Sequence, residues 1–366
     1  DGASCCGSAA APGPSKSDER PGYTLCSYVD SFIETKTGPV PIIKSRLSRD
    51  DLFSTFYVRC GIHRYQYTVA PGLYGIGTPD KDSDVLVTAN FKLTFDHLRK
   101  ELEGVNAWIL VLDTKGINVW CAAGKGTFST SELVFRVKDC GLDQVVDHKR
   151  LILPQLGAVG VSARQVKKQS GFRVIYGPIR AGDIKAFLRN NKKADKKMRM
   201  VTFSLYERFI LTPVEIQISL KPALIIALLL LVVSGIGPEI FSFSNALHRG
   251  GLGILAMVTG LLSGALVTPL LLPWLPFRQF AAKGIIAGSL FAVLLLIILS
   301  NAVTGIASNL AIFLFCVTTS SYLAMNFTGT TPFTSPSGVE KEMRQYIPVQ
   351  LASLVISSGL WLYAAF

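Results

Sequence analysis

The stretch Ala107-Trp108-Ile109-Leu110-Val111-Leu112-Asp113 gives the strongest strand signal in the chain, and Thr114-Lys115-Gly116 directly after it reads as a turn. A short apolar run that ends at a turn is typical of a buried strand. Similar runs predict strands at 84–88, 150–154 and 172–176, and amphipathic patterns predict helices at 94–102, 130–139, 162–170 and 182–190. Strands alternating with helices indicate parallel strands with crossover helices. We therefore expect a small doubly wound, Rossmann-like α/β domain whose ligand lies at the carboxyl ends of the strands.

The C-terminal part of the chain has the composition of a membrane domain. No charged residue occurs between Lys283 and Glu340, and five apolar segments cover 220–236, 251–275, 284–300, 302–327 and 347–366. Most approach the roughly 20 residues that cross about 30 Å of hydrocarbon. Buried helices of a soluble protein are the alternative, and the length of the charge-free region disfavours them. We expect a flexible N-terminal tail (1–45), an α/β domain (46–200), an amphipathic linker (201–219) and an all-α transmembrane domain of five helices (220–366).

The positive charge of the chain indicates how it lies in the membrane. The formal net charge is +12, and the densest basic run, 192–199, shortly precedes the first apolar segment. Such juxtamembrane runs are typical of contact with anionic lipid, so we expect membrane lipid and no nucleic acid as a partner. Basic residues also lie between segments two and three and between four and five. The pattern predicts a multi-pass protein of the cytoplasmic (inner) membrane with the α/β domain in the cytoplasm.

The cysteines argue against a disulfide framework. There are seven, at irregular spacing: Cys5, Cys6, Cys26, Cys60, Cys121, Cys140 and Cys316. An odd number without a regular pattern favours a reducing compartment. No C-x-x-C occurs, so we expect no iron–sulfur cluster in this chain. Residues 1–25 contain no long apolar core, and no signal peptide is predicted.

One constellation points to chemistry. The residues after the 107–113 strand include Asn118-Val119-Trp120-Cys121-Ala122-Ala123-Gly124-Lys125. Small residues after Cys121 would let a large flat surface approach the backbone. If 122–125 form a helical turn, Cys121 lies at its positive end with Lys125 four residues on, and both features favour a thiolate. Trp120 would shield the site from water. Ser129-Thr130-Ser131-Glu132 has the form of a capping box that starts the next helix.

Other interpretations of this stretch stay open from the residues alone. A single cysteine in an α/β domain is most often a small buried hydrophobe. Gly124-Lys125-Gly126-Thr127 suggests a phosphate loop, although the full spacing of that motif is absent. A cysteine nucleophile with His97 or His148 as its base is a third interpretation.

The run 118–125 resembles the cap-helix signature of the HgcA family, the corrinoid proteins of microbial mercury methylation. The resemblance extends over nearly the whole chain beyond the tail, including 67–79, 151–157, 176–178, the five membrane segments and the loop 326–339. The soluble half also resembles the corrinoid iron–sulfur protein of the acetyl-CoA pathway. It lacks that protein's cysteine cluster and barrel, and has membrane helices instead.

The resemblance implies a cofactor and its ligand. The domain would bind a cobalamin-type corrinoid in the base-off form, with Cys121 as the catalytic residue and the lower axial ligand of cobalt. The corrinoid contacts that the resemblance implies are Asn118, Val119, Trp120, Cys121, Ala122, Ala123, Gly124 and Lys125, together with Thr88, Gly157 and Gly177 at strand ends.

The implied activity is a corrinoid-dependent methyl transfer from cobalt to Hg(II), as a carbanion equivalent or a radical, giving methylmercury. The implied partners are a ferredoxin-like [4Fe-4S] protein (HgcB) as electron donor and a methyltetrahydrofolate-linked methyl donor. Cys5 and Cys6 would either hand over Hg(II) or be incidental thiols of the tail. The alternatives are a corrinoid methyl carrier of one-carbon (acetyl-CoA pathway) metabolism and a non-enzymatic membrane sensor or transporter.

Overall fold

The structure, a computed structural model, describes residues 21–22, 25–331 and 336–366. The chain divides into two compact units: a sheet domain, which takes in the described residues up to Val58 and Ile62–Thr202, and a helical domain, which takes in Arg59–Gly61 and Phe203–Phe366. Each unit is described by itself. Cys5 and Cys6 lie outside the described residues.

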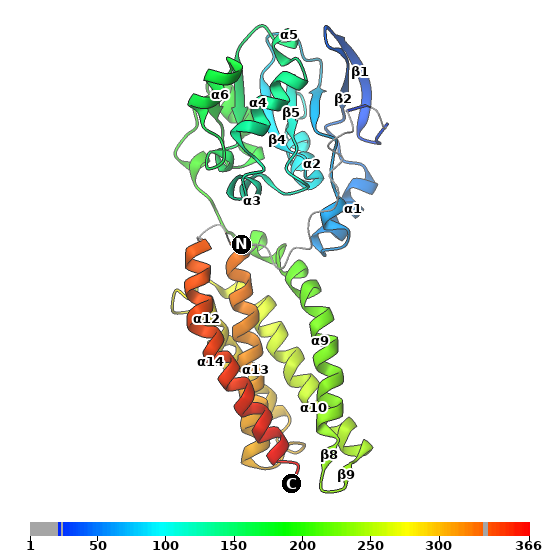
Figure 1. Cartoon of the computed structure of the whole chain (residues 1–366), viewed down its shortest axis with the longest axis vertical. Coiled ribbons are helices and arrows are strands. Elements are labelled where there is room, and N and C mark those ends of the chain that lie inside the picture. Colours follow the sequence, from blue (N-terminus) through cyan, green and yellow to red (C-terminus); the bar gives the residue numbers. More distant parts are fainter. Residues whose placement is uncertain (1–20, 23–24, 332–335) are drawn as a thin grey trace. The chain divides into compact units, whose positions relative to one another are not determined.

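The sheet domain is built on one seven-stranded mixed sheet (Figure 1). Its strands are β1 (Val29–Thr35), β2 (Gly38–Ile43), β3 (Gly72–Ile76), β4 (Val85–Ala89), β5 (Ala107–Leu112), β6 (Arg150–Leu153) and β7 (Arg173–Tyr176), in the order β1-β2-β3-β5-β4-β6-β7. Strands β4 to β7 are mutually parallel, whereas β3 runs antiparallel to β5 and β1 antiparallel to β2. The expected parallel arrangement is therefore confirmed for β4 to β7, within a sheet that is mixed as a whole.

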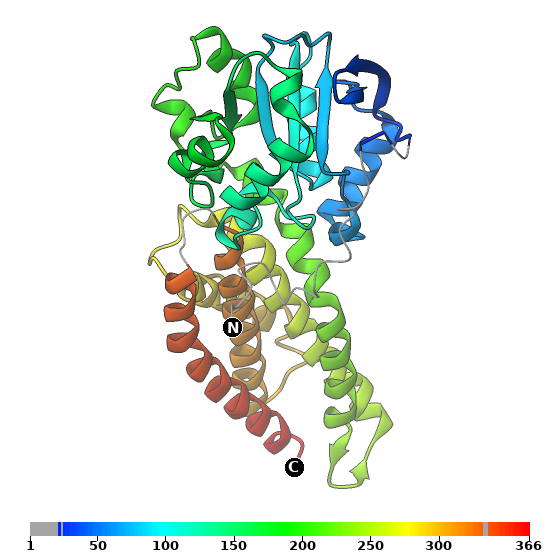
Figure 2. The same cartoon turned by 45° about the horizontal axis from the view of Figure 1, so that its top comes forward.

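The central strands are buried on both faces, because their side chains alternate between two cores. On β5, Trp108, Leu110 and Leu112 enter one core while Ile109 and Val111 enter the other. The first core is covered by α4 (Thr130–Asp139) and α6 (Ala163–Ser170), and the second by α2 (Lys92–Glu101) and α7 (Ile184–Arg189). Figure 2 shows the strands lying between these helices. Short pieces complete the domain: α1 (Arg49–Arg59), α3 (Val119–Gly124), α5 (Leu142–Val145), η1 (Arg64–Gln66), η2 (Gln155–Gly157), η3 (Ala181–Asp183) and η4 (Lys197–Arg199).

The eight elements predicted between residues 84 and 190 are confirmed, with ends that differ by a few residues. The predicted loose tail is wrong from residue 29 onward, because β1 and β2 form an antiparallel hairpin that joins the sheet through β3. Pro39 and Pro41 lie in β2. Proline lacks the N–H that a strand donates to its neighbour, and this argues against a strand when only the sequence is considered.

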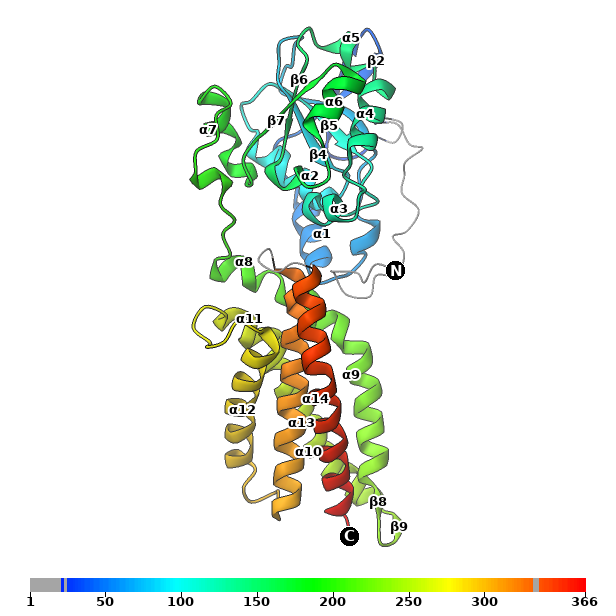
Figure 3. The ribbon, with the colours of Figure 1, turned by 60° about the vertical axis from the view of Figure 1, so that its left-hand side comes forward.

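In the part of the helical domain that the structure describes, five helices are long and apolar enough to cross a membrane. Its elements are α8 (Leu205–Phe209), α9 (Thr212–Ser234), α10 (Phe243–Leu262), the π-helical turn η5 (Ser263–Val267), α11 (Thr268–Leu271), α12 (Phe280–Ile298), α13 (Ile306–Asn326), η6 (Phe327–Thr330) and α14 (Pro336–Tyr363), with a small hairpin of β8 (Ile236–Gly237) and β9 (Ile240–Phe241). Figure 3 shows α9, α10, α12, α13 and α14 running alongside one another. This arrangement is compatible with the multi-pass membrane protein expected from the sequence.

Small residues allow the helices of this domain to approach closely. A Cβ at Gly284 would lie 2.6 Å from Cβ of Ala324, and a Cβ at Gly288 would lie 2.7 Å from Cβ of Ser320. The Ser320 hydroxyl donates to the carbonyl of Gly284 at 2.8 Å. Close small-residue contacts with interhelical hydrogen bonds are what holds helices together in lipid.

The stretch 201–219 was expected as an amphipathic linker, and most of it is helical. The Ser204 hydroxyl and the Glu207 carboxylate form a capping box that starts α8. Pro213 then lies in the first turn of α9, where a missing N–H costs nothing. The first of the long apolar helices, α9, therefore begins before residue 220, at Thr212.

Candidate functional site

The candidate site lies where the parallel strands β4, β5 and β6 end. The loop 113–118 leaves β5, and α3 follows it with Cys121. Lys115 and Gly116 both adopt a left-handed backbone, with φ of 57° and 69°. A Cβ at Gly116 would come within 2.9 Å of Thr68 Cγ2, so this turn needs glycine for its close approach as well as for its φ.

Asn90, directly after β4, holds the loop after β5 in place. Its carboxamide oxygen accepts hydrogen bonds from the Thr114 N–H at 3.1 Å, the Thr114 hydroxyl at 2.8 Å and the Gly116 N–H at 3.0 Å. Its amide nitrogen donates to Asp113 Oδ1 at 3.3 Å. Asn90 is completely buried, so water cannot replace these bonds. One side chain thus fixes the ends of two neighbouring strands.

α3 begins at Val119 with Asn118 as its N-cap. The Asn118 side chain accepts the backbone N–H of Cys121 at 2.9 Å. Cys121 therefore lies in the first turn of a short helix, slightly further from its start than expected, because the helix begins three residues before the predicted turn. Val119, Ala122 and Ala123 are buried in the first core, whereas Cys121 is half-buried. Trp120 is also half-buried.

The end of α3 is open on its outer side. Gly124, Lys125 and Gly126 are exposed, and a Cβ at Gly124 or Gly126 would meet no heavy atom within 4 Å. On the inner side, Phe128 is completely buried. A Cβ at Gly157 would lie 2.6 Å from the Phe128 ring. At Gly160 a Cβ would lie 2.1 Å from the Phe128 carbonyl oxygen. The loop after β6 therefore packs tightly against the chain that follows α3.

The strand-end residues predicted to contact a cofactor have clear packing roles. Thr88 is buried within β4, opposite Val111 of β5. Gly157 lies against Phe128, as described above. Gly177 follows β7, where its N–H donates to the Leu153 carbonyl at 2.8 Å, and a Cβ there would lie 3.2 Å from Ile152. Internal packing therefore accounts for both glycines, and their predicted contact with a cofactor stays a prediction.

The histidines do not lie with Cys121. His148 precedes β6, at the opposite end of the parallel strands, where its Nε2 contacts the Ser83 carbonyl at 2.9 Å. His97 belongs to α2, which covers the other face of the sheet. The cysteine–histidine interpretation therefore has no support in this arrangement.

The predicted capping box at α4 is confirmed in one half only. The Ser129 hydroxyl accepts the Glu132 N–H at 3.3 Å. The Glu132 carboxylate, however, accepts the Asp113 N–H at 2.9 Å and pairs with Arg136. This carboxylate joins α4 to the loop that leads to α3, a long-range contact that local sequence spacing does not predict.

Two residues that matter for this geometry were missed in the sequence. Asn90 is a single polar residue after an apolar strand, which is also the pattern of an ordinary loop residue. Position 160 requires glycine only because the backbones of Phe128 and Ala123 leave no room there for a side chain. The position of Asn90, two residues past the predicted strand 84–88, was the available signal, since ligands bind at that edge.

The chemistry available at this edge is that of one soft donor. Among the described residues, no three His, Cys, Asp or Glu side chains gather to hold a metal ion. A half-buried sulfur beside an open stretch of glycines suits a group that brings its own ring of ligands and needs one more from the protein. The donor and the open space at Gly124 thus fit a flat metal macrocycle.

Known proteins resemble the sheet domain. Residues 51–188 match the family described as CO dehydrogenase/acetyl-CoA synthase delta subunit. The acetyl-CoA decarbonylase/synthase complex subunit gamma of Archaeoglobus fulgidus is 30% identical over 170 residues, covering 45% of this chain and 36% of that protein. The same subunit of Methanocaldococcus jannaschii is 34% identical over 131 residues, covering 35% of this chain and 26% of that protein.

A third relative names the cofactor class. The corrinoid/iron-sulfur protein large subunit of Moorella thermoacetica is 36% identical over 118 residues, covering 32% of this chain and 26% of that protein. The matched part of this chain covers about a quarter to a third of the length of these relatives. Within its sheet domain, the chain is related to the large subunit of a corrinoid protein.

Proposed function

We propose that the sheet domain binds a corrinoid and that Cys121 is the protein ligand to its cobalt. The position of Cys121 carries the proposal: a half-buried thiol at the carboxyl edge of a domain related to a corrinoid protein, beside glycines with open space around them. When bound, the corrinoid would supply a cobalt centre that carries a methyl group. A thiolate would donate charge to that centre more strongly than a neutral ligand.

The residues around Cys121 would position the sulfur. Asn118 fixes the start of α3, and Ala122 and Ala123 anchor its inner face in the core. Asn90 and Glu132 fix the loop before it. Gly124 to Gly126 would let the ring lie close to the backbone, and Trp120 would limit water at the sulfur.

We further propose that the methyl group passes to Hg(II), with methylmercury as the product. The support is the run from Asn118 to Lys125, which resembles the HgcA signature over all eight residues. The electron donor would be a ferredoxin-like [4Fe-4S] partner of the HgcB type, and the methyl group would come from a methyltetrahydrofolate-linked system. The named relatives favour a second candidate, a methyl carrier of one-carbon metabolism. Both candidates use the same site and differ in the acceptor.

A pair of cysteine variants tests the proposal in the full chain. We expect Cys121→Ala to abolish methylmercury formation by membranes that contain the chain and a ferredoxin partner and that are supplied with Hg(II) and a methyltetrahydrofolate-linked methyl donor. Cys140→Ala is the matched control, since Cys140 is another half-buried cysteine of the same domain, and it should leave the activity unchanged.

The visible spectrum separates the two parts of the proposal. Purified chain without corrinoid absorption bands would refute the corrinoid site. A corrinoid-bearing chain that methylates a one-carbon acceptor but not Hg(II) would leave the carrier function and refute mercury methylation. Methylmercury formation undiminished in Cys121→Ala would refute the role of the thiol.

A further inference from the structure

α1 turns an apolar face toward solvent. The side chains of Leu52, Phe53, Phe56 and Tyr57 are 57%, 63%, 64% and 52% exposed; we call these four residues the α1 face. With 3.6 residues per turn they lie on one side of the helix, opposite its two buried residues, Asp51 and Val58. The apolar stripe of a surface helix normally faces the core. In α1 it faces outward, and contiguous exposed patches of this kind mark interaction sites.

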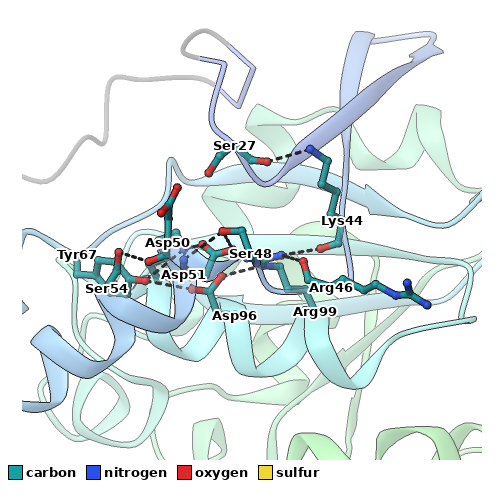
Figure 4. A network of polar contacts seen from close by, with 11 residues as sticks. Ser27, Lys44, Arg46, Ser48, Asp50, Asp51, Ser54, Tyr67, Asp96 and Arg99 are labelled. Carbon is teal, nitrogen blue, oxygen red and sulfur yellow. Dashed lines mark hydrogen bonds and ion pairs between the residues drawn. The ribbon is translucent and has the colours of Figure 1, made fainter.

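The inner side of α1 is held by charge. The Asp51 carboxylate pairs with Lys92 Nζ at 2.7 Å and with Arg99 Nη2 at 2.8 Å. Asp96 pairs with the same two cations, each at 2.7 Å. Figure 4 shows Asp51, Asp96 and Arg99 pointing toward one another. We call these four residues the buried ion cluster.

The buried ion cluster fixes the direction in which the α1 face points. Lys92, Asp96 and Arg99 belong to α2, which packs on the sheet. Asp51 also accepts the Ser48 N–H at 2.9 Å, and its own N–H donates to the Ser48 hydroxyl at 3.1 Å, which caps the start of α1. The helix is therefore attached to the sheet by its polar side and presents its aromatic side in one orientation.

We propose that the α1 face docks in the headgroup region of the lipid bilayer. The chain itself supplies the first argument: the sheet domain ends at Thr202, and the apolar segment Leu205–Ser234 follows almost at once. A domain tethered this closely to a membrane meets lipid at a high effective concentration, whereas a soluble partner must arrive by diffusion.

Composition supplies the second argument. Phenylalanine, tyrosine and leucine beside a cation are typical of helices that lie in the membrane interface. Arg49 is exposed and falls on the same side of the helix as the α1 face. The acidic residue nearest to the centre of α1, Asp51, is directed inward and neutralised within the buried ion cluster. Asp50 is also exposed and lies at the edge of the α1 face, so the apolar and aromatic area, rather than net charge, carries the attraction to lipid. This inference does not depend on the corrinoid proposal.

A photocrosslinker placed on the α1 face tests the proposal in the full chain. Phe53 or Phe56 would be replaced by benzoylphenylalanine in protein reconstituted in nanodiscs of phosphatidylethanolamine and phosphatidylglycerol. Phe135 is the matched control, since it is a phenylalanine of the same domain with 55% exposure, on α4. After illumination, mass spectrometry should find phospholipid adducts at positions 53 and 56, at least about tenfold above position 135, a ratio that a preference of only about 1.4 kcal/mol produces.

Three outcomes would overturn the proposal: lipid adducts no more frequent than at position 135, adducts mainly with a second copy of the chain, or adducts mainly with another protein. A second measurement serves if a benzoylphenylalanine variant folds poorly. Phe56→Trp and Phe135→Trp, each compared with the unchanged chain, report on contact with brominated lipid through fluorescence quenching. Additional quenching in Phe56→Trp alone supports docking, and equal quenching in both variants contradicts it.

Discussion

The side-chain oxygen of Asn118 lies 2.9 Å from the backbone nitrogen of Cys121 and accepts its hydrogen bond. The residue that would bind cobalt is thus held by the cap of its own helix. This contact links a packing feature to the proposed chemistry, because any loosening of the cap would let the sulfur move.

The cap contact predicts the effect of changing Asn118. Asn118→Ala should destabilise α3 by about 1 kcal/mol, since alanine offers no acceptor to the Cys121 N–H. Asn118→Asp keeps the acceptor and should retain most of the stability. Hydrogen exchange of the Cys121 amide measures this, with about fivefold faster exchange expected for the alanine variant alone. Equal exchange in the two variants would contradict the role of the cap.

Substitution of Asn90 should lower the thermal stability of the sheet domain more than substitution of residues near it. Asn90→Ala leaves the N–H groups of Thr114 and Gly116 without their acceptor in a buried place, at a cost of about 3 kcal/mol or more, whereas the Thr114 hydroxyl still has the Ile117 carbonyl at 2.7 Å. Thermal unfolding followed by circular dichroism should show a clear drop in the midpoint. Thr127→Val is the control, since the Thr127 hydroxyl makes only long contacts of 3.4 and 3.5 Å. A similar loss in both variants would argue against Asn90 as the residue that joins the strand ends.

Two glycines of the site should respond differently to a larger side chain. Gly157→Leu should destabilise the sheet domain by several kcal/mol, because the new side chain would overlap the Phe128 ring. Gly124→Leu should leave thermal stability nearly unchanged, since its surroundings are open, and should lower the corrinoid content of the purified chain. Full corrinoid content in Gly124→Leu would show that the ring does not approach this residue.

The buried ion cluster predicts how the attachment of α1 depends on pH. Burial alone would raise the pKa of Asp51, but hydrogen bonds from Lys92, Ser48 and Arg99 outweigh it and hold the pKa well below its ordinary value of 3.8. Burial would lower the pKa of Lys92, but Asp96 and Asp51 outweigh it and raise the pKa above 10.5. The cluster should therefore stabilise α1 fully between about pH 4 and about pH 10, and lose this contribution progressively outside that range.

The variant Asp51→Asn mimics, at neutral pH, the uncharged Asp51 side chain that forms in acid. Asp51→Asn should cost about 3–5 kcal/mol, because it removes one partner of buried charges. Amide hydrogen exchange along α1 at pH 7 should then accelerate strongly, while exchange along α4 stays the same. Asp50→Asn is the control, since Asp50 is the exposed neighbour on the same helix. Equal effects of the two substitutions would mean that the cluster does not attach α1.

The parts of the fold that follow simple periodicity could be predicted. β5 is apolar throughout because both of its faces are buried, and the chain between residues 84 and 190 repeats this pattern. β2 was missed because Pro39 and Pro41, which lack a backbone N–H, are unusual within a strand. α1 was missed for a different reason. Its apolar stripe faces outward and one of its two buried residues is an aspartate, so the usual pattern is largely inverted.

The site could be predicted only in part. The motif around Cys121 and its place after β5 followed from the sequence, since both depend on residues near one another in the chain. Asn90, Glu132 and Gly160 act through contacts between distant segments, and their spacing carries no local signal. The relatives support a corrinoid protein. Transfer to Hg(II) stays a prediction that rests on the resemblance to the HgcA family, above all in the run 118–125.

The two ends of α3 differ in the space around them. The start is capped by Asn118 and follows a loop bonded to Asn90, whereas Gly124 and Gly126 at the other end have no close neighbours on their outer side. A molecule seated on Cys121 would meet a capped helix start on one side and open space on the other. Rings with different peripheral groups would then fit over the same glycines, while the sulfur keeps its place.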